Sequence, residues 1–142
     1  MIRIAIALLL IVALPCKASA ANCSLTEQQW LGNELDHLKS WAAIHESFRK
    51  YTPQCDDGFF AEGYSDAVVV QLARRWSTLT ELNQISQRDP TFRGFVLKHI
   101  DATTDSDDLK AVATNASTRC PKVLKTLCTD IENAAKQAIK DL

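Results

Sequence analysis

Apolar side chains recur at steps of three or four residues along most of the chain after residue 23, which is the spacing of one face of an α-helix. The first such region begins near Ser24 or Thr26, because Ser24 with Glu27 and Thr26 with Gln29 both fit a capping box. The pattern is interrupted near Lys39–Ser40. Thr52–Pro53 ends the region, because a proline disfavours helical backbone in the residue before it. We therefore predict a first helical region over residues 24–52 with a break near its middle.

A second amphipathic stripe runs from Phe60 to Leu82, and a bend is expected near Trp76. Later helix starts are marked by capping residues or by proline in the first turn: Asp89–Pro90, Asp105 or Ser106, and Cys120–Pro121. The last of these is expected to open a helix that runs to the end of the chain. Each start is followed by another helical stripe of apolar residues.

Strands are not indicated anywhere in the sequence. The chain has only four glycines and four prolines, and no stretch alternates apolar and polar residues between hairpin turns. Apolar residues make up 46% of the chain, which is typical of a folded protein. We predict an all-α protein in which residues 21–142 form a single domain, a small antiparallel bundle of four to six helices tied by two disulfides.

The first 20 residues have the pattern of a cleavable secretory signal. A basic Arg3 precedes the uncharged apolar run 4–14, and Ala18 and Ala20 supply the small residues read at cleavage. The apolar run has eleven residues, whereas a membrane-spanning helix needs about 20, so we expect no stable membrane span. Acylation at Cys16 is disfavoured because the bulky Pro15 precedes it. We predict cleavage between Ala20 and Ala21 and a periplasmic or secreted protein.

Four cysteines remain after cleavage, and an even number in an oxidising compartment predicts disulfides. They are Cys23, Cys55, Cys120 and Cys128. Their spacings match no common structural zinc site. If Cys120 and Cys128 both lie in the last helix, they are about 12 Å apart, too far for a disulfide. The expected pairings are therefore 23–128 with 55–120, or 23–120 with 55–128, and both would tie the end of the chain to the first helical region.

Charge and motifs exclude several functions. Removal of the signal changes the formal net charge from −1 to −3, which makes nucleic acid an unfavourable partner. The acidic segment 101–108 lacks the glycine and glutamate positions of a calcium loop, so helix capping explains it better. We find no cofactor or metal motif.

Catalytic residues cannot be assigned from the sequence. The three histidines, His37, His45 and His99, have no recognisable catalytic partner. Ser65 lies in a Gly-Tyr-Ser-Asp-Ala segment that faintly resembles a nucleophile elbow, but no strand precedes it. A small exported hydrolase with an unrecognised active site is therefore the alternative function.

The segment Cys55–Glu62 is the strongest candidate for a recognition site. A disulfide would anchor it, and it offers an aromatic side chain beside acidic ones, in Asp56, Asp57, Phe59 and Glu62. The competing interpretation is that an aspartate caps the following helix and both phenylalanines of the segment pack inward. We predict a non-enzymatic interaction protein, such as an inhibitor, an immunity-type protein or a ligand-binding protein, whose partner is another protein or a small ligand.

Overall fold

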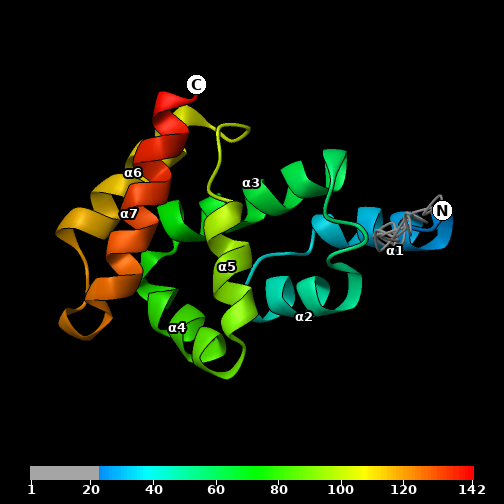
Figure 1. The fold of residues 1–142 in the computed structure, drawn as a ribbon, viewed down its shortest axis with the longest axis horizontal. Helices are drawn as coiled ribbons and strands as arrows, with labels where there is room; N and C mark the ends of the chain where they lie inside the picture. The colour runs from blue at the N-terminus through cyan, green and yellow to red at the C-terminus, as the bar shows by residue number, and fades with distance from the viewer. Residues whose placement is uncertain (1–22) are drawn as a thin grey trace, which may run out of the picture.

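The computed structural model describes residues 23–142, in which all regular structure is helical (Figure 1). The helices, in chain order, are α1 (Leu25–Leu35), α2 (Trp41–Tyr51), α3 (Gly58–Arg74), the 3-10 helix η1 (Trp76–Thr78), α4 (Leu79–Arg88), α5 (Pro90–Lys98), α6 (Ser106–Thr118), the 3-10 helix η2 (Lys122–Leu124) and α7 (Lys125–Lys140). The predicted all-α class is confirmed. These described residues hold seven α-helices rather than four to six, because each of the two long predicted regions is divided into separate helices.

Most of the predicted helix starts are confirmed by their capping geometry. Ser24 and Glu27 form the complete capping box of α1. Ser40, at the predicted break, caps α2 by accepting the amide hydrogen of Ala43. Asp89 and Asp105 cap α5 and α6. Side-chain oxygens at these positions satisfy amide groups that have no partner within the helix, which is why the sequence alone located them.

The expected bend near Trp76 is a complete break, and tertiary contacts explain it. Asn115, on α6, donates hydrogen bonds from its Nδ2 to the carbonyl oxygens of Leu72 and Ala73, at 3.1 and 3.0 Å. The indole of Trp76 is buried and donates to the carbonyl of Arg119, at 2.9 Å. Since side chains elsewhere satisfy the end of α3, the chain can turn there without leaving buried carbonyl groups unpaired.

Helix α3 connects the two ends of the molecule. The hairpin of α6 and α7 lies at one end of the long axis and α1 lies toward the other, with α3 running between them (Figure 1). Helix α3 contacts α1, α2 and α6, while α5 contacts α4 and α7. The shared core contains fully buried side chains from several helices, among them Leu72, Phe92, Leu109 and Ile131.

The predicted disulfide pairings are wrong. Cys23 is bonded to Cys55, and Cys120 is bonded to Cys128. The pairing was predicted wrongly because the last helix begins later than the sequence suggested. Cys120 lies outside any helix, η2 follows it, and α7 begins only at Lys125. The chain therefore folds back before the helix, and the Cα atoms of Cys120 and Cys128 are 6.0 Å apart rather than about 12 Å.

Candidate recognition loop and the buried network behind it

The segment Cys55–Glu62 joins α2 to α3 and is held at its first residue. Cys55 is buried, bonded to Cys23, and its amide donates to the carbonyl of Tyr51 at 2.9 Å. Asp57 is the N-cap of α3. Gly58 has a φ of +52°, a backbone conformation that favours glycine. We call residues 55–62 the recognition loop, although its second half is the first turn of α3.

Phe59 points into solvent. Its side chain is 69% exposed and contacts the ring of Phe60 edge-on, with 5.6 Å between the ring centroids. Phe60 instead packs partly against the core, on the face that continues to Tyr64 and Val68. The competing interpretation of the sequence is therefore right about the aspartate cap, at Asp57, and wrong about Phe59. Successive side chains on a helix point about 100° apart, so Phe60 faces inward while Phe59 does not.

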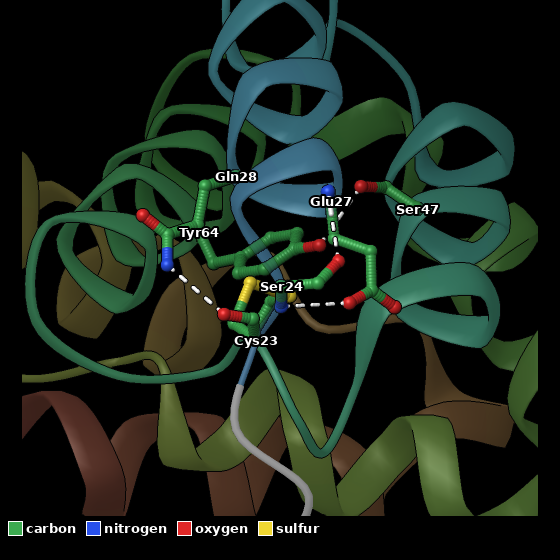
Figure 2. Close-up of a disulfide and its surroundings, with 7 residues drawn as sticks. Cys23, Ser24, Glu27, Gln28, Ser47 and Tyr64 are labelled. Carbon is green, nitrogen blue, oxygen red and sulfur yellow. Dashed lines mark hydrogen bonds between the residues drawn. A yellow bond between two sulfur atoms is a disulfide. The ribbon is translucent and has the colours of Figure 1, made fainter.

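A shallow depression of about 320 Å³ lies beside Phe59, between the start of α1 and the start of α3. It is lined by Cys23, Gln28, Gln54, Cys55, Asp57, Gly58, Phe59 and Phe60. Figure 2 shows the α1 side of this region, where the capping box and a 3.0 Å hydrogen bond from Gln28 to the carbonyl of Cys23 surround the disulfide. The start of α1 is thus fixed against the loop.

Asp56 points away from this surface. Its side chain is only 7% exposed, and its carboxylate lies 2.6 Å from Nζ of Lys98 and 3.0 Å from Nε2 of His99. The His99 contact is off the axis of the N–H bond, so it is an ion pair rather than a well-aligned hydrogen bond. Burial alone would raise the pKa of Asp56, but His99 and Lys98 together hold it below its ordinary value. The other candidate binding residues, Asp57, Phe59 and Glu62, are exposed.

Ser65 and His99 are far apart in the sequence, but their side chains meet in the interior, beneath the recognition loop. Oγ of Ser65 lies 2.9 Å from Nδ1 of His99 and 2.6 Å from Oδ2 of Asp101, and both Ser65 and His99 are buried. Sequence reasoning missed Asp101 as a partner, because it follows Ser65 by 36 residues. The available signal was that Ser65 falls on the buried face of α3, where a hydroxyl group needs a hydrogen-bond partner.

The hydrogen-bond directions in this network show where the protons lie. The single hydroxyl hydrogen of Ser65 has two neighbours that can only accept, the Asp101 carboxylate and the carbonyl of Ala61 at 3.0 Å. Oγ must therefore accept the hydrogen of His99 Nδ1. Nε2 lies 3.0 Å from the ionised carboxylate of Asp56, so a hydrogen on Nε2 would be attracted to that carboxylate and a bare nitrogen would not.

This proton arrangement is opposite to that of a catalytic triad. In a Ser-His-Asp triad the histidine accepts the serine proton, and the serine is open to substrate. Here His99 donates to Ser65, and Ser65 has no exposed surface. Among residues 23–142 the three groups are together, but the serine is neither activated nor reachable. The network of Asp56, Ser65, His99 and Asp101, which we call the buried network, is built to hold segments together.

The remaining candidate residues serve local structure. Nε2 of His45 lies 3.0 Å from the cap residue Asp89, and His37 is exposed just after α1. In the acidic segment, Asp105 caps α6, as predicted, and Asp108 forms an ion pair with Arg74. Within residues 23–142, one cluster has metal-like spacing, Cys23, Glu27 and Cys55, but its two sulfurs are joined in a disulfide.

Comparison of the chain with protein-family models, with curated proteins and with solved structures finds no match. In the described part, 23–142, no helix combines the length and apolarity needed to cross a membrane.

Proposed function

We propose that this chain is an exported, non-enzymatic interaction protein, and that the recognition loop is its binding surface. The observation that carries the proposal is the 69% exposure of Phe59 in the first turn of α3, just after two residues that are held by the Cys23–Cys55 disulfide and by the ion pairs of Asp56. A large apolar side chain on a rigid support loses little conformational entropy on binding. Such anchors are typical of protein interfaces.

The charges around Phe59 indicate the chemistry of the partner. Asp57 and Glu62 are exposed on either side of it in sequence, and the residues lining the adjacent depression include no basic side chain. An apolar anchor with acidic neighbours fits a partner surface that has an apolar pocket bordered by lysine or arginine. We therefore propose a protein partner with a basic rim rather than an anionic ligand.

Export is part of this proposal. Cleavage between Ala20 and Ala21 would leave the four cysteines that form the two disulfides, and such bonds persist in the periplasm or outside the cell. Residues 1–22 lie outside the described part of the structure, so the signal peptide stays a prediction from sequence. The intact mass of the exported protein should correspond to residues 21–142 with four oxidised cysteines. A mass that retains the first 20 residues, or one showing acylation at Cys16, would contradict it.

The binding role can be tested with a pair of matched variants. Tagged wild-type protein is used to capture partners from its native compartment, and Phe59→Ala is compared with Val123→Ala, which truncates another exposed apolar side chain, in η2. A partner identified with the wild type should bind Phe59→Ala more weakly by about 1–2 kcal/mol, and Val123→Ala equally well. The melting temperatures of all three should agree.

Two outcomes would overturn the proposed function. One is a partner that binds wild type and Phe59→Ala with the same affinity. The other is turnover of a peptidoglycan, peptide or ester substrate that Ser65→Ala abolishes without loss of fold, since this would establish the hydrolase alternative.

A further inference from the structure

We propose that the buried network is a proton-dependent lock on the recognition loop: the loop is ordered while His99 carries both ring protons and Asp56 is ionised, and it is released when either condition fails. As a statement about the regulation of a binding surface, this inference rests on the proposed function. The order of the loop can nevertheless be measured without any partner, so the two proposals can fail separately.

Three segments meet at His99. The recognition loop supplies Asp56, α3 supplies Ser65, and the end of α5 with the turn after it supplies Lys98 and Asp101. Of these, only Asp56 comes from the loop. The polar contacts between the loop and the end of α5 therefore pass through one carboxylate.

The groups that face His99 are few and their charges balance. The charged neighbours are Asp56, Lys98 and Asp101, so with a protonated His99 the cluster holds two positive and two negative charges. The aromatic neighbours are Phe95, from α5, and Tyr64, from α3, with ring centroids 4.3 and 5.7 Å from that of His99. Burial raises the pKa of Tyr64 to about 12, so this phenol adds no negative charge beside His99 near neutral pH.

Loss of the His99 proton would affect the loop more than the rest of the fold. The ring would then offer neither a positive charge nor a hydrogen at Nε2 to Oδ1 of Asp56, 3.0 Å away, and the carboxylate would keep only Lys98, whose side chain is 58% exposed. A buried charge that loses its partner is strongly unfavourable. Asp56 can avoid this by moving into water, and Phe59 lies three residues further along the same loop. The disulfide at Cys55 and the α6–α7 hairpin do not depend on this contact.

The first test follows the wild-type protein by NMR as the pH is raised. The ring nitrogens of His99 should show two attached protons at the acidic end of the titration. The amide resonances of residues 56–61 should then shift with the same midpoint as the His99 ring. An unprotonated ring nitrogen throughout, or loop resonances that do not move while His99 titrates, would overturn the proposal.

The second test compares Asp56→Asn with Asp108→Asn, which removes another carboxylate from an ion pair, that with Arg74 on α3. At one pH, amides 56–61 should exchange their hydrogens at least about tenfold faster in Asp56→Asn than in wild type, while the exchange rates of α6 and α7 stay unchanged. In Asp108→Asn the loop amides should exchange at the wild-type rate. Equal loop exchange in Asp56→Asn and wild type would overturn the lock. If Asp56→Asn does not fold, the same exchange measurement is made on His99→Gln, and its loop amides should again exchange at least about tenfold faster than in wild type. Loss of folding in both variants would count against a lock confined to the loop.

If the loop is locked as proposed but Phe59→Ala binds the partner normally, the lock stands and the proposed function fails. If Phe59 is essential for binding while the loop does not respond to His99, the proposed function stands and the lock fails.

Discussion

At the scale of single residues, ion pairs and hydrogen bonds lower the pKa values of two partly buried aspartates. Burial opposes ionisation of Asp56, but its contacts with His99 and Lys98 outweigh this and lower its pKa. Burial likewise opposes ionisation of Asp101, yet Ser65 and Thr103 donate hydrogen bonds to it and its pKa is also lowered. Each carboxylate is therefore more readily ionised in the folded chain than in the unfolded one, and ionisation favours folding.

We expect Asp56→Asn to destabilise the protein by about 2–3 kcal/mol near neutral pH, because it removes a charge that pairs with Lys98 and His99. A carboxyl group with a lowered folded pKa contributes its stability above its ordinary value of 3.8 and loses it as the pH falls below that value. The difference between wild type and variant should therefore shrink in acid. Urea unfolding over a pH series measures it.

Asp107→Asn is the control for this series, since that side chain is 86% exposed and pairs only with Lys110. It should change stability little at any pH. A gap between wild type and Asp56→Asn that widens as the pH falls below 3.8 would contradict the assignment.

At the scale of helices, a glycine sets how closely α1 approaches α3. A Cβ atom at Gly63 would lie 2.7 Å from Cδ1 and 2.8 Å from Cδ2 of Leu35. Leu35 is at the end of α1, so the missing side chain at Gly63 lets the two helices pack at this point. Gly94, in the interior of α5, has nothing within 4 Å of the same position. Gly63 and Gly94 therefore differ in their surroundings, although both lie inside helices.

We expect Gly63→Ala to be less stable than Gly94→Ala by about 1–2 kcal/mol. Both substitutions gain the higher helix propensity of alanine, about 1 kcal/mol in a helix interior, so the comparison isolates the contact with Leu35. Thermal or urea unfolding of the two variants measures the difference. If Gly63→Ala is as stable as Gly94→Ala, then Leu35 turns aside without cost, and the close approach does not depend on glycine.

At the scale of the whole molecule, both disulfides are local. One closes the segment from Cys23 to Cys55 around α1 and α2, and the other closes the eight-residue turn that precedes and enters α7. Neither links the hairpin of α6 and α7 to the first helices. That hairpin is attached to the rest of the protein by the packing of α6 on α3 and of α7 on α5, and by the bonds from Asn115 to the end of α3.

Removing the two disulfides separately should have unequal effects. The entropy of closing a loop grows with its length, so the bond spanning 32 residues should contribute about 3.7 kcal/mol and the bond spanning 8 about 2.5 kcal/mol. Paired Cys→Ser variants measured by urea unfolding give both values. Peptide mapping without reduction should first recover fragments linked 23–55 and 120–128. A fragment linked between residue 128 and residue 23 or 55 would contradict the structure.

Local signals made most of the fold predictable. Capping side chains act within three residues of the amides they satisfy, so Ser24, Asp89 and Asp105 could be recognised from the sequence. The break of α3 at Arg74 depends on Asn115 and Trp76, and the first of these lies more than 40 residues away. The disulfide error has a similar origin. A continuous last helix was a reasonable expectation from Cys120–Pro121, but the chain turns before α7 begins.

For the candidate site, the sequence by itself determined which residue types lie together along the chain: a cysteine, two acids, a glycine and two phenylalanines in succession at the start of a helix. It also determined the all-α class, because helical periodicity is a local property. Only the tertiary structure decided that Asp56 turns inward, that Phe59 remains exposed, and that Ser65, His99 and Asp101 meet behind the loop. Burial and hydrogen-bond direction depend on residues brought together from distant parts of the chain, so the local pattern of the sequence did not determine them.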